Sequence, residues 1–113
     1  MRVAGSGSTP KPAPDLLASN GERKVAIECK SVKGDKRYFD YSELMQLKLF
    51  AKGFGAEAWV GIRFDNRGWM FLPVEKIRKS KGESFLVSYD GLVKRGLKFE
   101  EFIGKYRQKR INL

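Results

Sequence analysis

The chain has 113 residues, of which 42% are hydrophobic, and this is enough for one globular domain, residues 1–113, with a single core. Its formal net charge is +10 and it has no histidine, so nucleic acid is the first partner to consider, and histidine-based zinc sites, catalytic triads and general bases are excluded. No apolar run approaches the ~20 residues that span a bilayer, and no signal-peptide core is present, so we expect a cytoplasmic or nucleoid-associated protein.

Residues 1–14 are rich in Gly, Ser and Pro and hold little apolar surface, so they predict an exposed, mobile loop. Two interpretations remain open for this segment. It is either a disordered leader or a loop that approaches phosphates through Ser hydroxyls, glycine amides and Lys11.

Pro14-Asp15 is followed by Glu28 and Lys30, which are two residues apart. The run 24–30 has strand character, so Glu28 and Lys30 project from one face of the strand. The Asn-Gly step at Asn20 predicts a hairpin that brings Asp15 beside Glu28. Carboxylates are the ligands that a hard cation needs for phosphodiester hydrolysis, and a lysine beside them can position water or phosphate. This spacing predicts a metal-dependent nuclease site.

Glu28, Lys30 and Cys29 can also be interpreted as ordinary strand residues without a catalytic role. A lone Glu-x-Lys pattern is most often a solvated strand face, and only its combination with Asp15 across a hairpin favours a metal site. Cys29 lies on the apolar face of the same strand with Val25 and Ile27. With no histidine to activate it, this cysteine is expected to be a buried hydrophobic residue and not a nucleophile.

Residues 31–38 form a basic, polar connector in which four side chains are candidate DNA contacts: Lys33, Lys36, Arg37 and Tyr38. Residues 42–52 then have helical period, with Ser42 as the expected N-cap and Leu44, Leu47 and Ala51 as the apolar stripe. Glycines on either side of Phe54 are expected to end this helix. Gln46 is either an exposed helix residue or a side chain that points toward the metal site, and the helix pattern favours the first.

Residues 57–64 and 69–72 are rich in aromatic and β-branched residues and are expected to be adjacent antiparallel strands joined by the turn 65–68. Trp59 and Trp69 are expected in the core. A helical turn opened by Pro73, a basic loop and a strand over 84–88 follow. A basic helix over 98–110 closes the chain, with an apolar face formed by Phe99, Phe102, Ile103 and Tyr106.

The order of these motifs resembles the archaeal-type Holliday junction resolvases (Hjc) of the PD-(D/E)xK nuclease superfamily. The resemblance runs from Arg2 to about Leu72 and is carried by six features: Arg2-Val3-Ala4-Gly5-Ser6-Gly7, Pro14-Asp15, Ile27-Glu28-Cys29-Lys30, the connector with Tyr38, the Gln-bearing helix ending Phe54-Gly55, and the aromatic hairpin. It implies an α/β restriction-endonuclease-like fold, a central mixed β-sheet flanked by helices.

The resemblance also implies an activity. It implies a homodimeric endodeoxyribonuclease that resolves four-way DNA junctions in recombination and repair, with Mg²⁺ as cofactor and Mn²⁺ as a substitute. The dimer surface implied is the helix around 44–54 with the aromatic strands beside it. A phage or viral origin is equally compatible with these motifs.

Site residues can be transferred from the family position by position. Asp15 and Glu28 are implied as metal ligands together with the Cys29 carbonyl, and Lys30 as the catalytic lysine. Gln46 is implied near the site, which reverses the interpretation from helix pattern alone. The DNA-contacting residues implied near the scissile strand are Arg2, Ser6 and Ser8.

One departure from the family pattern concerns the N-terminus. The family begins with a helix that carries a further acidic metal-site residue, and the sequence opens where that helix is expected to end. Two alternatives therefore stand beside an active resolvase. One is a noncatalytic or weakly active DNA-junction-binding module, and the other is a different PD-(D/E)xK repair or restriction nuclease.

Overall fold

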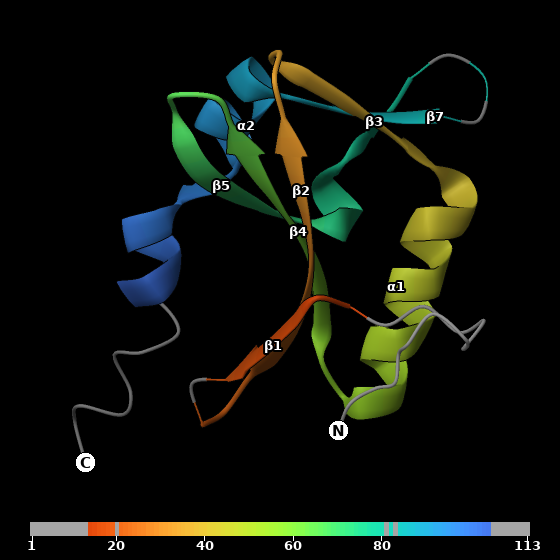
Figure 1. The fold of residues 1–113 in the computed structure, drawn as a ribbon. Helices are drawn as coiled ribbons and strands as arrows, with labels where there is room; N and C mark the ends of the chain where they lie inside the picture. The colour runs from red at the N-terminus through yellow and green to blue at the C-terminus, as the bar shows by residue number, and fades with distance from the viewer. Residues whose placement is uncertain (1–13, 20, 81, 83, 105–113) are drawn as a thin grey trace.

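A computed structural model describes residues 14–19, 21–80, 82 and 84–104 (Figure 1). Residues 1–13 of the loop predicted over 1–14, with Arg2, Ser6, Ser8 and Lys11, lie outside the described residues, as do Asn20 and the part of the predicted C-terminal helix beyond residue 104. No helix within the described part of the chain is long and apolar enough to cross a membrane.

A five-stranded mixed sheet forms the centre of the molecule (Figure 1). Its order is β1-β2-β4-β5-β8, with bounds Leu16–Ser19, Lys24–Val32, Glu57–Phe64, Gly68–Pro73 and Leu97–Lys98. β2 and β4 are parallel, whereas the other neighbours are antiparallel. The predicted hairpin before β2 and the predicted antiparallel pair of aromatic strands are both confirmed.

The parallel pairing of β2 with β4 requires a crossover, and helix α1 (Tyr41–Phe54) supplies it. The predicted stripe of Leu44, Leu47 and Ala51 is buried. The prediction of Ser42 as N-cap is wrong, because the preceding strand runs to Asp40, which holds the N-cap position in extended conformation without a side-chain cap. Gly55 ends the helix in the left-handed region, at φ 69°.

Residues 31–38, predicted as a connector, are instead mostly strand. β2 continues to Val32, and β3 (Lys36–Asp40) pairs with β7 (Ser84–Ser88), which in turn pairs with β6 (Arg78–Lys79). This three-stranded sheet escaped sequence analysis because only Phe39 of β3 is fully buried, so five mostly polar residues show no clear apolar alternation.

Two short elements near the end of the chain were also not predicted. Helix α2 (Tyr89–Arg95) follows β7, and the Ser88 hydroxyl caps it by accepting a bond from the Gly91 amide at 3.0 Å. Seven residues with a central glycine are too few to show helical period. Strand β8 separates α2 from a helical segment over 99–104, so Lys98 belongs to a strand. The predicted turn after Pro73 is the short helix η1 (Val74–Lys76).

The central sheet separates two groups of buried side chains. Ala26 and Val60 belong to the group under α1, whereas Val25, Ile27 and Trp59 belong to the opposite group with Phe71 and Phe102. Trp59 is 3% exposed, as predicted, and Trp69 packs at the edge of the second group. The alternation predicted for β2 is therefore confirmed, and it directs Glu28 and Lys30 toward the α1 side of the sheet.

Candidate active site

Asp15 is held against β2 just before β1 begins. Its backbone amide donates to the Ile27 carbonyl at 3.0 Å, so the hairpin pairing continues one residue beyond the strand. Its carboxylate Oδ2 accepts a hydrogen bond from the Cys29 amide at 2.8 Å. These two bonds fix the Asp15 carboxylate beside the middle of β2, which is the position that the predicted hairpin requires.

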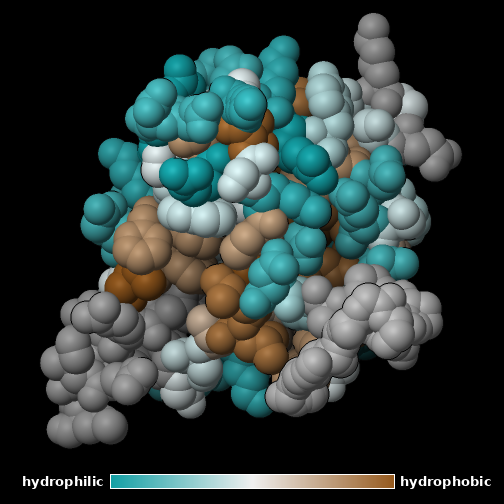
Figure 2. All heavy atoms as spheres, viewed as in Figure 1, coloured by the Kyte–Doolittle hydropathy of each residue, from teal (hydrophilic) through white to brown (hydrophobic). Residues whose placement is uncertain are grey.

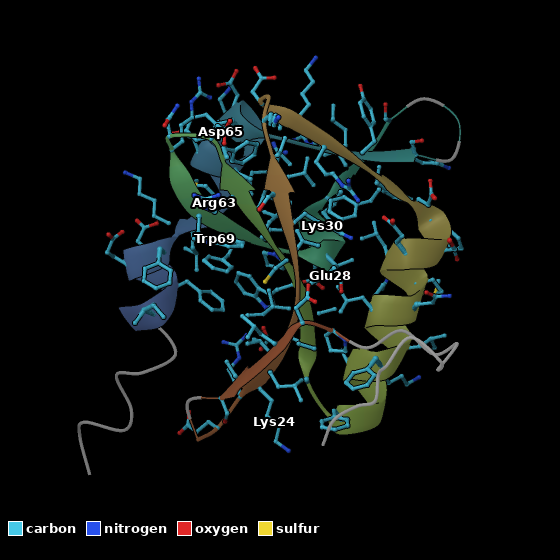
Figure 3. The ribbon with its side chains drawn as sticks, in the orientation of Figure 1. Lys24, Glu28, Lys30, Arg63, Asp65 and Trp69 are labelled. Carbon is cyan, nitrogen blue, oxygen red and sulfur yellow. The ribbon has the colours of Figure 1, made fainter. Side chains whose placement is uncertain are left out.

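Glu28 and Lys30 lie on one face of β2, on the side of the sheet that α1 covers (Figure 3). The Lys30 ammonium is 3.4 Å from Glu28 Oε2. Both side chains are only about 30% exposed, at 29% and 30%. The lysine therefore contacts the carboxylate in a partly desolvated setting, where charge interactions are stronger than at an open surface.

The pKa of Glu28 is raised above its ordinary value of 4.5, chiefly by burial and then by the neighbouring Asp15 carboxylate. Lys30 acts in the opposite direction, and Glu43 adds a smaller raising effect. Two carboxylates that repel each other at a partly buried position are the electrostatic environment that a bound cation relieves.

A small cavity of about 100 Å³ adjoins these groups, and Glu28, Lys30 and Pro14 form one wall. α1 supplies the other wall, including Glu43 and Gln46. Gln46 lines the cavity, in agreement with the family resemblance, and it is also exposed, as the helix pattern alone predicted. Glu43 was missed, although its position three residues before Gln46 places both on one side of a helix.

Cys29 turns its side chain toward the opposite face of the sheet, where it packs against the group containing Val25 and Ile27. Burial, followed by the nearby charges of Asp15 and Glu28, raises the pKa of its thiol. The sulfur is therefore poorly suited to act as a nucleophile at neutral pH, as expected.

The donors present fit a hard cation that keeps much of its water. No cluster of three or more His, Cys, Asp or Glu side chains arranged for a metal occurs in the described ranges. Hard cations such as Mg²⁺ commonly bind through one or two carboxylates, several waters and substrate phosphates, and Asp15 and Glu28 match that number of carboxylates. The absence of thiolate and imidazole donors here disfavours zinc.

The expected DNA contacts of the connector lie in three settings. Lys36 and Tyr38 are exposed, and Tyr38 is 53% accessible. Lys33 lies beside the β4–β5 turn in a cavity that also contains Arg67. Arg37 is partly buried, 3.8 Å from Glu43 and stacked over Phe39, so its guanidinium lies next to the active-site cavity. Hydrophilic side chains cover the end of the molecule that carries these loops (Figure 2).

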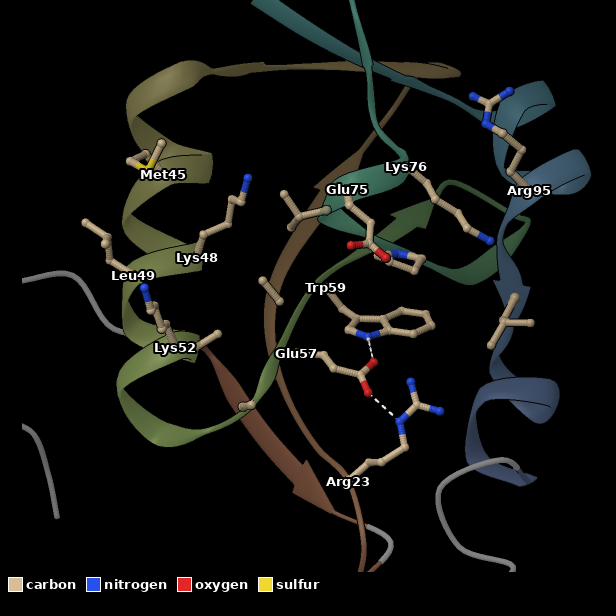
Figure 4. A pocket seen from close by; sticks show the side chains of 16 residues that line it. Arg23, Met45, Lys48, Leu49, Lys52, Glu57, Trp59, Glu75, Lys76 and Arg95 are labelled. Atoms are coloured by element: carbon tan, nitrogen blue, oxygen red, sulfur yellow. Dashed lines mark hydrogen bonds and ion pairs between the residues drawn. The ribbon is translucent and has the colours of Figure 1, made fainter.

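A larger groove of about 840 Å³ lies on the other side of α1 (Figure 4). Met45, Leu49 and Lys52 line it from the helix. Across from them, the Glu57 carboxylate accepts hydrogen bonds from Arg23 and from the Trp59 indole. This groove contains no metal-ligand pattern, and its carboxylate at Glu57 already has partners.

Comparison with known families identifies this arrangement. Residues 1–111 match the model of the archaeal Holliday junction resolvase family (Hjc). A crossover junction endodeoxyribonuclease Hjc from Archaeoglobus fulgidus is 39% identical over 110 residues, which are 97% of this chain and 79% of the relative. A protein of the same name from Sulfolobus acidocaldarius is 29% identical over 105 residues, covering 91% of this chain and 72% of the relative.

The fold matches as well. The solved structure of Archaeoglobus fulgidus Hjc, a Holliday junction resolvase, superposes with a TM-score of 0.78 at 38% identity, covering 92% of this chain and 84% of that one. These matches confirm the nuclease fold and the family that the sequence motifs predicted. The chain belongs to the archaeal Holliday junction resolvase (Hjc) family.

Proposed function

We propose that this protein is a metal-dependent, structure-selective endodeoxyribonuclease that resolves four-way DNA junctions as a homodimer. The observation that carries the proposal is that Glu28 and Lys30 line one cavity while the Asp15 carboxylate is held beside them on β2, in a chain that belongs to the Hjc family. The names of the relatives, crossover junction endodeoxyribonucleases, point to the same activity.

In the proposed reaction, Asp15 and Glu28 hold Mg²⁺, with the Cys29 carbonyl as a further oxygen donor. Mg²⁺ would supply charge neutralisation at the scissile phosphate and a more acidic bound water, and Mn²⁺ would substitute for it. Lys30 orients the attacking water or holds a non-bridging phosphate oxygen, because its ammonium already lies against the Glu28 carboxylate. Gln46 lines the same cavity and can donate its amide to the phosphate.

We propose that junction recognition depends on phosphate geometry and not on base edges. Lys33, Lys36, Arg37 and Tyr38 follow β2 directly, and the chain carries a net charge of +10. Contacts from these side chains to phosphates fix the position and orientation of the DNA but do not read its sequence. The Arg37 guanidinium is 3.8 Å from Glu43, which lines the cavity, so we propose that it contacts a phosphate near the one that is cut.

For the dimer, we propose the outer face of α1 as the contact surface. Leu49 is 61% exposed and Phe54 is 51% exposed, and the Phe54 ring stacks on Phe50 at 5.0 Å. Large apolar side chains exposed on one helix mark a candidate association surface. The groove beside Leu49 also offers Lys48 and Lys52, which are exposed cations that can pair across a two-fold interface (Figure 4).

The test is cleavage of a synthetic four-way junction compared with linear duplex of the same sequence. We expect Mg²⁺-dependent, paired cuts in the junction, little cutting of the duplex and complete loss of products with EDTA. Equal cutting of both substrates would refute the resolvase assignment and leave a general nuclease of the same superfamily.

A noncatalytic junction-binding module is the second candidate, and the specific observation that favours it is that the described residues contain no group of three or more side chains placed to hold a metal. Tight junction binding with no product at high Mn²⁺ would support this candidate. If Glu28→Ala then left the binding unchanged in the presence of metal, the carboxylate would have no role in either step.

A further inference from the structure

The three-stranded sheet β3–β7–β6 has two faces with different side chains. Phe39 and Val87, at 1% exposure each, point into the core. Directly paired residues of antiparallel strands share a face, so the pairs Lys36–Ser88 and Tyr38–Leu86 lie together on the other side. Arg78 pairs with Leu86 and joins them. The outer face of this sheet therefore runs across all three strands and carries Lys36 and Arg78, with Asp40 on the same face at its far end.

This face ends at a cavity of about 380 Å³ between the sheet and α2. Arg78 and Lys79 line it from β6, and Lys94 and Arg95 line it from α2. Asp90 is the one acidic residue among its lining residues. Four cations facing one carboxylate in a concave site favour an anion over an apolar or a cationic ligand.

Arg95 gives the cavity a donor without a protein partner. Its Nε is buried and makes no hydrogen bond. Its guanidinium lies against Gly91, because a Cβ added at that glycine would come within 2.7 Å of Arg95 Nη2. A buried, unpartnered N–H costs free energy, and an acceptor oxygen entering the cavity would recover that cost.

We propose that this cavity and the outer sheet face form a second phosphate-binding site, which holds the backbone of a duplex DNA arm beyond the active site. The inference rests on the proposed function for its ligand, since an enzyme that acts on four-way junctions has to hold arms as well as the cut strand. The phosphate oxygens would accept bonds from Arg78, Lys94 and Arg95.

Strand β3 joins the two places. Phe39 lines the active-site cavity, and Lys36, three residues earlier on the same strand, pairs with Ser88, which lines the basic cavity. Phe39 and Lys36 lie on opposite faces of the sheet, so the basic cavity would hold a different stretch of the DNA from the one that is cut.

The test compares four-way junctions whose arms are either half a helical turn or about two turns long, with Ca²⁺ in place of Mg²⁺ to limit cleavage. The variant is Arg78→Gln with Lys94→Gln, both exposed residues whose replacement leaves the core intact. We expect about a tenfold loss of affinity for long arms, little loss for short arms, and a salt slope lower by about 1.8, because each lost phosphate contact removes about 0.9.

A matched control removes the same charge elsewhere. Lys24→Gln with Lys98→Gln neutralises two exposed lysines of the large sheet, and Lys24 lies at the far end of β2 (Figure 3). We expect this pair to leave the ratio of long-arm to short-arm affinity unchanged. Equal weakening for both arm lengths, or the same change in the control, would overturn the proposal and indicate general electrostatics.

The outcome can be separated from the proposed function. If the wild-type protein shows no preference for junctions over duplex, the resolvase assignment fails. The same variant measured on short and long linear duplexes still tests the phosphate site, because a length-dependent loss there would support it. An unchanged affinity on long duplexes and long-armed junctions would refute it.

Discussion

The two sides of α1 carry different kinds of site. On one side, a cavity of about 100 Å³ contains Glu28 beside Asp15, and burial with like-charge repulsion raises the pKa of Glu28. On the other side, a groove of about 840 Å³ is lined by both apolar and charged side chains, and the Glu57 carboxylate in it accepts hydrogen bonds from Arg23 and Trp59. The larger volume of the groove is therefore a poor guide to the site that we propose for the chemistry.

The difference lies in how each site satisfies its charges. Glu57 has two donors, whereas the pKa of Glu28 stays raised although Lys30 is its partner, and such a carboxylate gains free energy when a cation arrives. Exposed apolar side chains such as Leu49 are suited to association with another protein surface. The comparison therefore supports the proposals of chemistry at the small cavity and of dimer contact at the groove.

The largest expected effect separates chemistry from binding at the small cavity. Glu28→Gln keeps the shape of the side chain but removes a metal ligand, so junction cleavage in Mg²⁺ should fall by at least about a hundredfold, the upper loss seen for groups that only support metal ligands. Junction affinity should be retained or rise, since a negative charge near the DNA is lost. Single-turnover cleavage and fluorescence anisotropy measure the two effects.

The control for this variant is Glu100→Gln, which neutralises an exposed glutamate of the final helical segment. It should leave single-turnover cleavage within twofold of the wild type. If Glu28→Gln cleaves at the wild-type rate, the small cavity is not the metal site and the contrast between the two sides of α1 is lost.

A medium effect is expected at the groove. Leu49→Asp places a charge in the middle of the proposed dimer surface, where the leucine is 61% exposed and its loss costs the fold little. Burying that charge should raise the dimer dissociation constant at least about tenfold, or 1.4 kcal/mol. Analytical ultracentrifugation measures the dissociation, and thermal unfolding checks the fold.

Val93→Asp is the comparable substitution on another helix, at a valine that is 53% exposed on α2. This variant should remain as dimeric as the wild type. A dimer that survives Leu49→Asp but dissociates with Val93→Asp would move the interface from α1 to α2.

Sequence analysis could predict the parts of the site that follow from local geometry. Glu28 and Lys30 share a face because strand side chains alternate. Asp15 lies beside them because the hairpin pairs β1 antiparallel with β2. The stripe of Leu44, Leu47 and Ala51 followed in the same way from helical period. The family resemblance added Gln46, which no local pattern could direct toward the cavity.

The parts that sequence analysis missed depend on contacts between distant segments. β3 has one fully buried residue, Phe39, and its strand conformation comes from pairing with β7, more than forty positions later. The helix pattern around Glu43 does not indicate a site residue, because Glu43 lines the cavity only through the packing of α1 over β2. Arg78 and Arg95 line one cavity because α2 packs near β6 in the fold, and no periodic pattern in the sequence predicts that packing.

The smallest expected effect is the dependence of stability on pH without metal. Burial and Asp15 raise the pKa of Glu28 in the folded protein above the ordinary value of 4.5 that applies in the unfolded chain. The folded state therefore binds this proton more tightly, so its contribution to stability is full below pH 4.5 and is lost as pH rises through the folded pKa.

Glu28→Gln has no proton to lose, so its melting temperature should exceed that of the wild type by a margin that grows with pH across this window and then stays constant. Saturating Mg²⁺ should shrink the margin, because the cation stabilises the charged carboxylate only in the wild type. Calorimetry at several pH values measures it. A margin that is independent of pH would mean that burial and Asp15 do not raise the pKa of Glu28 in the folded protein, and the electrostatic contrast between the two sides of α1 would be lost.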